Sequence, residues 1–142
     1  MNQVSDQELL VVIKDFLEMG HVDTIAAMFV QDPSYYSWIG AILNDERFNV
    51  RLGVSVLFED LKERVPEQLG RAIPSLLPLL KSNSPHIRGE AISVLGIIGT
   101  LQARELIVSM LSDSHPLVAE VAQDILSELG ETSMRKENTI SS

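Results

Sequence analysis

Apolar side chains recur along this chain in one spacing that occurs three times. After a first apolar residue, others follow at offsets of +4, +7, +8 and +11. These offsets place all five side chains on one face of an α-helix, because the helix turns once in 3.6 residues. The pattern therefore predicts three amphipathic helices. Their buried stripes are Val50, Val54, Leu57, Phe58 and Leu61; Ile87, Ala91, Val94, Leu95 and Ile98; and Val118, Ala122, Ile125, Leu126 and Leu129.

A second apolar helix precedes each stripe, so the unit of repetition is a pair of helices. Polar turns separate the two helices of a pair at residues 44–47, 82–85 and 112–116. A repeat of 20 to 50 residues that contains two helices predicts a solenoid, in which each unit packs only on its neighbours. The predicted core positions of the preceding helices are Tyr35, Ile39, Ile42 and Leu43; Ala72, Leu76, Leu79 and Leu80; and Ala103, Ile107, Met110 and Leu111.

Two of the polar turns end in a proline that can start the next helix. Pro85 and Pro116 fit the first helical position, where a backbone N–H has no partner in any case. We expect Ser84 to precede one of these helices, and Ser114 or His115 to precede the other. A serine side chain at such a cap can accept a hydrogen bond from a free backbone N–H.

The run IPSLLPLLKSNSPHIRGEAISVLGIIG, residues 73–99, resembles a HEAT repeat. It is similar to the short kind found in armadillo-type bacterial HEAT-like and phycobilisome-lyase-like proteins. That family has a proline in the first helix, which Pro74 matches. It also has an aspartate in the turn and an arginine six residues later, which Asp45 and Arg51 match. The resemblance covers residues 34–130 and implies a right-handed α-α superhelix.

The resemblance also implies a ladder of aspartate and arginine side chains between neighbouring repeats. The second copy keeps Arg88 but has Ser82 in place of the aspartate. The third copy keeps Asp113 but has Ala119 in place of the arginine. Since Arg88 and Asp113 each lack a partner in their own repeat, we expect them to pair across the repeat boundary.

The fold class is therefore an all-α solenoid of about eight helices in four antiparallel pairs. Residues 1–130 are expected to form one domain, with atypical capping helices in 1–32 and repeats in 33–64, 66–99 and 100–130. The first helix should begin at Asp6, because Ser5 and Glu8 form a capping box. The tail, 131–142, has few aliphatic residues and is expected to be disordered.

Two prolines leave the helix before the 82–85 turn open to two interpretations. If this helix begins near Glu67, Pro74 lies in its interior and should kink it. If it begins near Arg71, Pro74 lies in the first turns and only Pro78 interrupts the helix.

Composition narrows the class of protein. The net charge is −9, with acidic ends and a balanced middle, so nucleic acid is a poor ligand. The hydrophobic content of 45% excludes a disordered chain, and there is no cysteine. No apolar run reaches the roughly 18 residues of a membrane-spanning helix. These features, with an N-terminus that lacks a basic signal region, predict a cytoplasmic protein without a membrane role.

Nothing in the sequence points to catalysis, to a cofactor or to a metal. The three histidines are not part of a His-Glu dipeptide, and no glycine-rich phosphate loop is present. Acid pairs such as Glu59 and Asp60 are more typical of a solvated helix face. We therefore expect a protein that is not an enzyme. The alternative is an accessory or catalytic protein of the chromophore-lyase-like HEAT group.

The expected function is a non-catalytic protein–protein interaction module, a small scaffold or a regulator. Tyr35, Tyr36 and Trp38 cluster in one helix and either pack in the core or form a partner-binding patch, with Tyr36 as the exposed member. The resemblance implies that the second helix of each pair lines a concave binding surface. We expect a protein partner with a basic surface, and a monomer or weak homo-oligomer. The candidates on that surface are Arg51, Ser55, Glu59, Ser93, Glu120, Gln123, Asp124 and Ser127.

Overall fold

The computed structural model describes the backbone of residues 5–141 and the side chains of residues 5–130. Over this range the chain forms α-helices and short 3₁₀ segments, and no strand. In chain order the elements are α1 (Asp6–Glu18), α2 (Val22–Gln31), η1 (Pro33–Trp38), α3 (Ile39–Leu43), α4 (Phe48–Arg64), η2 (Pro66–Ala72), α5 (Ile73–Leu76), η3 (Leu77–Lys81), α6 (Pro85–Ile98), α7 (Leu101–Ser109) and α8 (Pro116–Ser141).

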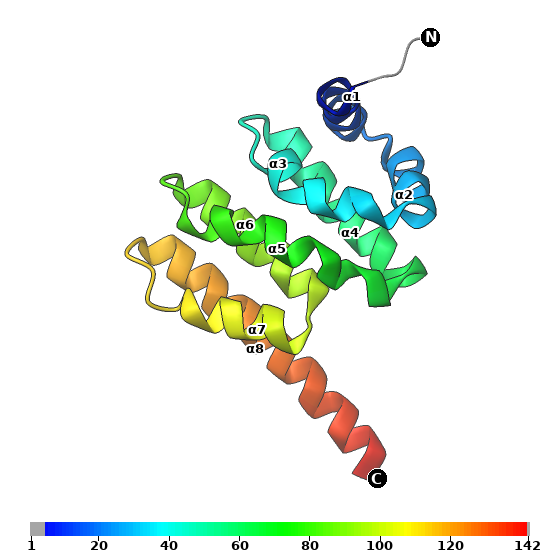
Figure 1. Ribbon diagram of the computed structural model, residues 1–142. Helices are drawn as coiled ribbons and strands as arrows, with labels where there is room; N and C mark the ends of the chain where they lie inside the picture. Colours follow the sequence, from blue (N-terminus) through cyan, green and yellow to red (C-terminus); the bar gives the residue numbers. More distant parts are fainter. Residues whose placement is uncertain (1–4, 142) are drawn as a thin grey trace.

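The helices stack as pairs, one layer on the next, with the two termini at opposite ends of the stack (Figure 1). Helices α4, α6 and α8 are the second members of successive pairs, and α6 packs between the other two. The first members are η1 with α3, then η2 with α5 and η3, then α7. This arrangement confirms the predicted all-α solenoid.

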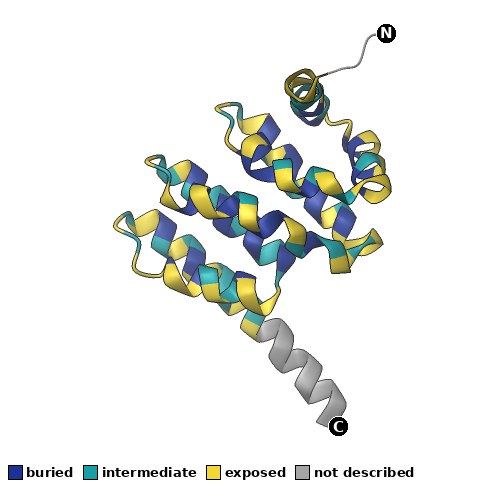
Figure 2. Ribbon diagram, viewed as in Figure 1, coloured by how far each residue is buried: buried dark blue, intermediate teal, exposed yellow. Residues whose placement is uncertain are grey.

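The three predicted stripes contribute to the hydrophobic core. All five stripe residues of α4 are fully buried, and those of α6 are buried as well. One hydrophobic cluster runs from Ile13 to Ala122, and Figure 2 shows its buried positions between the layers. In α8 the stripe is buried at Val118 and Ala122 but only half-buried from Ile125 onward, where the last helix has a neighbour on one side only.

Proline divides the stretch before the 82–85 turn into three short segments. Pro66 opens η2, Pro74 is the second residue of α5, and Pro78 is the second residue of η3. Each ring therefore lies in the first turn of a segment, where its missing N–H breaks no hydrogen bond. The chain thus interrupts the helix at both prolines, so neither of the two sequence-based interpretations describes it fully.

Tyr36 is fully buried, so its assignment as an exposed binding residue is wrong. The cause is the 3₁₀ conformation of η1, in which residues three apart lie on one side. Tyr36 and Ile39 therefore face the core together, whereas Tyr35 is half-buried. The ring of Tyr36 packs edge-on against Phe29 and Phe58, with centroids 5.1 and 6.2 Å away.

Glycine allows neighbouring layers to approach closely. The backbone N of Gly40 donates to Ser75 Oγ at 2.9 Å, which joins α3 to α5. A Cβ at Gly40 would lie 2.0 Å from the backbone oxygen of Ser75. At Gly96, a Cβ would lie 2.6 Å from Cγ2 of Ile125 in α8. At Gly40 the obstacle is backbone, so a larger residue would force α3 and α5 apart, whereas at Gly96 a shift of the Ile125 side chain could make room.

The helix ends match the sequence in most places. Ser5 Oγ accepts from the backbone N of Glu8 at 3.1 Å, so α1 begins as expected. Pro85 and Pro116 each occupy a first helical position. Before α8, Nδ1 of His115 accepts from the N of Leu117 at 3.2 Å.

Ser84 occupies the cap position before α6, as expected, but its side chain makes no cap hydrogen bond. The backbone N of Ser84 donates to Ser82 Oγ at 3.1 Å in a local turn. One expectation at a helix end is wrong. Leu111 is exposed rather than buried, because α7 ends at Ser109 and Leu111 lies in the turn that follows.

Two further points concern the C-terminal region and the membrane. The predicted disorder of residues 131–142 falls outside the residues whose side chains are described, and it stays a prediction.

In the part of the chain that the structure describes, no helix has the length and apolar character needed to cross a membrane.

Candidate functional site

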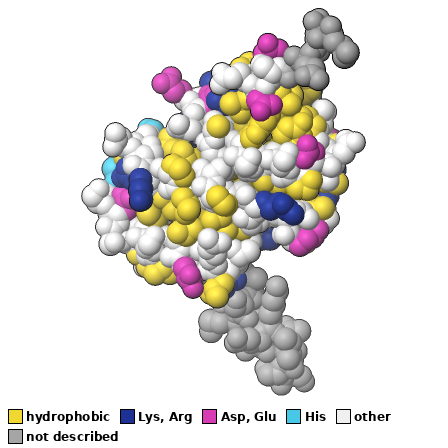
Figure 3. Space-filling view, viewed as in Figure 1, with side chains coloured by type: hydrophobic (Ala, Val, Ile, Leu, Met, Phe, Trp, Pro, Cys, Tyr) yellow, Lys and Arg dark blue, Asp and Glu magenta, His cyan; other side chains and the backbone are white. Residues whose placement is uncertain are grey.

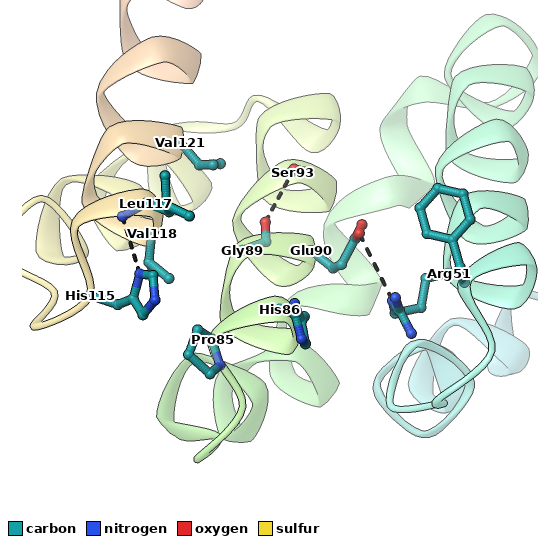
Figure 4. Close-up of a pocket in the computed structure, with 11 residues that line it drawn as sticks. Arg51, Pro85, His86, Gly89, Glu90, Ser93, His115, Leu117, Val118 and Val121 are labelled. Atoms are coloured by element: carbon teal, nitrogen blue, oxygen red, sulfur yellow. Dashed lines mark hydrogen bonds and ion pairs between the residues drawn. The ribbon is translucent and has the colours of Figure 1, made fainter.

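A groove of about 620 Å³ crosses the turn ends of α4, α6 and α8 (Figure 4). We call it the main groove. Three successive repeats contribute to it, so it exists only in the stacked chain. Its lining residues are Phe48 and Arg51 from α4; Pro85, His86, Gly89, Glu90 and Ser93 from α6; and His115, Leu117, Val118 and Val121 from α8 and the turn before it.

The main groove is deep over α6 because small residues of this helix line it there. A Cβ at Gly89 would meet no atom within 4 Å, so this glycine faces open space. Ser93, one turn later, donates its hydroxyl to the backbone oxygen of Gly89 at 3.1 Å. The flanking helices carry larger apolar residues, Phe48 and Leu117, and both are more than half exposed.

An apolar row on α4 continues from the groove. Phe48, Leu52 and Val56 are 59, 48 and 47% exposed and recur every four residues, so they share one face. Leu52 and Val56 also border a hollow of about 330 Å³ next to the α1–α2 corner. This row was not predicted from the sequence. The available signal was that Phe48, Leu52 and Val56 all lie off the five-position stripe of the same helix.

Exposure of apolar side chains alone does not select this face. Leu101 and Val108 of α7 are also more than half exposed. Figure 3 shows further hydrophobic side chains between charged ones on the face that Figure 1 turns to the viewer. The α4 row differs because it adjoins a hollow that also contains polar and charged groups.

The structure brings together some of the predicted surface residues and separates others. Arg51 and Ser93 line the main groove. Glu59 and Ser93 line a further hollow of about 380 Å³ between α4, α6 and α8. Ser55 of α4 is half-buried, and Trp38 is half-buried in η1 against Tyr35, with ring centroids 5.1 Å apart. The remaining predicted residues are exposed on α8 outside the hollows described above: Glu120, Gln123, Asp124 and Ser127.

The expected pair between Arg88 and Asp113 is present. Nε and Nη2 of Arg88 donate to the two carboxylate oxygens of Asp113, each at 2.9 Å. The two side chains are only 13 and 8% exposed. The guanidinium lowers the pKa of Asp113 below its ordinary value. This fork joins α6 to the turn of the next repeat.

The ladder differs from expectation at the first repeat. The carboxylate of Asp45 binds Arg47 at 3.1 Å and Lys14 of α1 at 3.3 Å, rather than Arg51. The hydrogen bond from Arg47 lowers the pKa of Asp45 to about 2. Asp45 therefore connects its repeat to the preceding layer, as Asp113 does.

Arg51 reaches the backbone of its own turn instead. Its Nη1 donates to the carbonyl oxygens of Asp45 and Glu46 at 2.8 and 2.9 Å. Its Nε lies 3.9 Å from a carboxylate oxygen of Glu90 and has no hydrogen-bond partner. The centre of the guanidinium lies 5.8 Å from the centroid of the Phe48 ring. Figure 4 shows Arg51 turned toward Glu90 across the groove.

No described cluster of three or more histidine, aspartate or glutamate side chains has an arrangement that could hold a metal ion. A family model of HEAT repeats matches residues 36–127, nearly two thirds of the chain. No curated protein and no solved structure matches this chain. HEAT repeats are generally protein-interaction scaffolds and are typically non-catalytic. The three stacked helix pairs and the family match lead to one conclusion: the chain belongs to the HEAT-repeat family.

Proposed function

We propose that this protein is a non-catalytic scaffold or regulator that binds a partner protein along the main groove and the adjoining row on α4. The observation that supports this proposal best is the row of Phe48, Leu52 and Val56. A folded chain that buries a continuous core but leaves three apolar side chains aligned beside a groove has a surface suited to a partner.

The groove offers both parts of a protein-binding surface. Phe48 and Leu117 provide exposed apolar area on its two sides, and burying them would supply the non-directional part of the affinity. Arg51, His86 and Glu90 provide polar groups that orient a partner. Such a mixture fits a folded surface or a peptide segment better than a small reactive substrate.

Charge suggests the character of the partner beyond the groove. The protein has a net charge of −9, and Glu120 and Asp124 are exposed on α8. A partner with basic residues opposite α8 would associate faster and with better register. The proposed partner therefore has apolar residues for the α4 row and basic residues for the C-terminal repeat.

Affinity capture with matched variants tests the proposal. Wild-type protein, Leu52→Ser and Val108→Ser would each be immobilised and exposed to extract from the native host. Leu52 and Val108 are about equally exposed, so each substitution removes a similar apolar area without opening the core. We expect proteins captured by the wild type to be retained by Val108→Ser and lost with Leu52→Ser. Equal capture by all three would contradict the proposed surface.

A further inference from the structure

Arg51 and Arg88 occupy equivalent positions and are held in the same way. Each follows the first residue of its buried stripe, in α4 and α6 respectively. Each uses Nη1 to donate to the carbonyl oxygen of the residue six positions earlier, Asp45 or Ser82, and both distances are 2.8 Å. The backbone therefore fixes one corner of each guanidinium.

The two arginines differ in the partners of their other guanidinium nitrogens. Arg88 presents Nε and Nη2 to Asp113, in the turn of the following repeat. The residue at the equivalent turn position for Arg51 is Ser82, which has no carboxylate. The contact from Arg51 Nε to Glu90 is 3.9 Å, too long for a hydrogen bond. A buried donor without a partner is unfavourable, and the guanidinium fork matches a carboxylate.

There is also space beside Arg51. A hollow of about 540 Å³ lies between the turn at residues 44–46 and residues 84–87, and Arg51 lines both this hollow and the main groove. The exposed ring of Phe48 lies next to the guanidinium and offers apolar area there. The place where a ladder carboxylate is missing therefore lies at the edge of the proposed binding surface.

We infer that Arg51 recognises a carboxylate of the partner, which completes the ladder in place of the absent aspartate. This inference rests on the proposed function. The carboxylate is that of an Asp or Glu side chain or of a chain terminus, and an apolar residue next to it packs on Phe48. In the complex, the partner's carboxylate replaces the 3.9 Å contact with Glu90. The basic residues expected opposite α8 lie over a different repeat, so the two features are compatible.

Peptide selection provides a test without knowledge of the partner. A display library of random 12-residue peptides would be selected on the full-length protein, and selected peptides would be titrated by fluorescence polarisation. We expect them to carry an Asp or Glu, or to need a free C-terminal carboxylate, beside an apolar residue. Asn or Gln replacements and amidated peptides separate the two sources of the carboxylate.

Variants of the protein then move the affinity in opposite directions. Arg51→Gln should weaken binding about 10- to 100-fold, as expected for a lost hydrogen-bonded charge. Ser82→Asp should also weaken binding, because it supplies a carboxylate from the chain itself, and it should raise the melting temperature. Glu90→Gln should strengthen binding, because it removes a competing negative charge. A general loss of structure cannot produce this set of signs.

Three outcomes separate the two ideas. The inference is supported if Arg51→Gln weakens the affinity for the selected peptides but no longer changes the affinity once the peptide carboxylate is neutralised. Peptides that lose affinity for Leu52→Ser but not for Arg51→Gln overturn the inference and leave the proposed function standing. A selection with no enriched peptide, or with peptides unaffected by either variant, overturns both.

Discussion

Close approach of α3 and α5 at Gly40 makes the stacking of the layers testable with one methyl group. In Gly40→Ala, the new Cβ would lie 2.0 Å from the backbone oxygen of Ser75, whereas real Cβ contacts are essentially never below 3.0 Å. The helices would have to separate by about 1 Å, and the hydrogen bond from Gly40 N to Ser75 Oγ would weaken. Both segments are held by buried side chains on either side, so neither can move freely.

The expected loss follows from these contributions. Overpacking of a tight contact costs about 1–3 kcal/mol, and more when the obstacle is backbone. The weakened hydrogen bond adds about 1 kcal/mol. Alanine recovers about 0.5–1 kcal/mol, because it has less backbone freedom to lose than glycine. We therefore expect Gly40→Ala to lower the free energy of unfolding by about 3 kcal/mol.

Gly89→Ala is the matched control, because a Cβ there meets no atom within 4 Å. This variant should gain about 0.5–1 kcal/mol, since Gly89 lies inside α6. Urea unfolding followed by far-ultraviolet circular dichroism measures both changes against the wild type. If Gly40→Ala proved as stable as the wild type, or if both variants shifted in the same direction, the described packing of α3 on α5 would be wrong.

Two further predictions concern the ladder and the buried tyrosine. A double-mutant cycle on Arg88 and Asp113, each changed to Ala, should give a coupling energy above that of the more exposed pair Arg64 and Asp60, whose side chains are 44 and 27% exposed. Because Arg88 lowers the pKa of Asp113, this stabilisation is present above the ordinary carboxyl pKa and should fade as pH falls below it; a coupling that does not change with pH would contradict this. Tyr36→Phe removes a buried hydroxyl that has no partner, so it should raise the free energy of unfolding by about 1 kcal/mol at pH 7. Burial raises the pKa of Tyr36 to about 12, so the wild type should lose stability between about pH 10 and 12, and urea titrations should show a smaller loss for the variant. Equal losses of stability in the wild type and in Tyr36→Phe over this pH range would contradict the burial of the Tyr36 hydroxyl.

The buried stripes could be predicted because they depend on a spacing that a regular helix imposes. Leu57 and Val94 are fully buried for the reason the sequence indicated. The contact between Arg88 and Asp113 could also be predicted, because each residue lacked its counterpart within its own repeat. Patterns that repeat along the chain therefore identified the contacts between repeats.

Positions in the 3₁₀ segments and on the exposed faces were not predictable in the same way. The burial of Tyr36 depends on a local change from 3.6 to 3.0 residues per turn, which proline permits but does not specify. The exposure of Leu52 and Val56 depends on which neighbours cover α4, and hydrophobicity alone does not show that. Two observations together were needed to identify the Arg51 Nε that has no hydrogen-bond partner. One is Ser82 in place of the aspartate, which the sequence shows. The other is the pair of backbone hydrogen bonds that orient the guanidinium, which only the structure shows.

Site-specific photo-cross-linking tests the central claim, that a partner protein lies over the row on α4, most directly. Benzoylphenylalanine would be placed at position 52 in one protein and at position 108 in another, and each would be irradiated in extract from the native host. We expect discrete adducts from position 52 that are absent from position 108. Adducts from position 108 alone, or none from position 52, would contradict it.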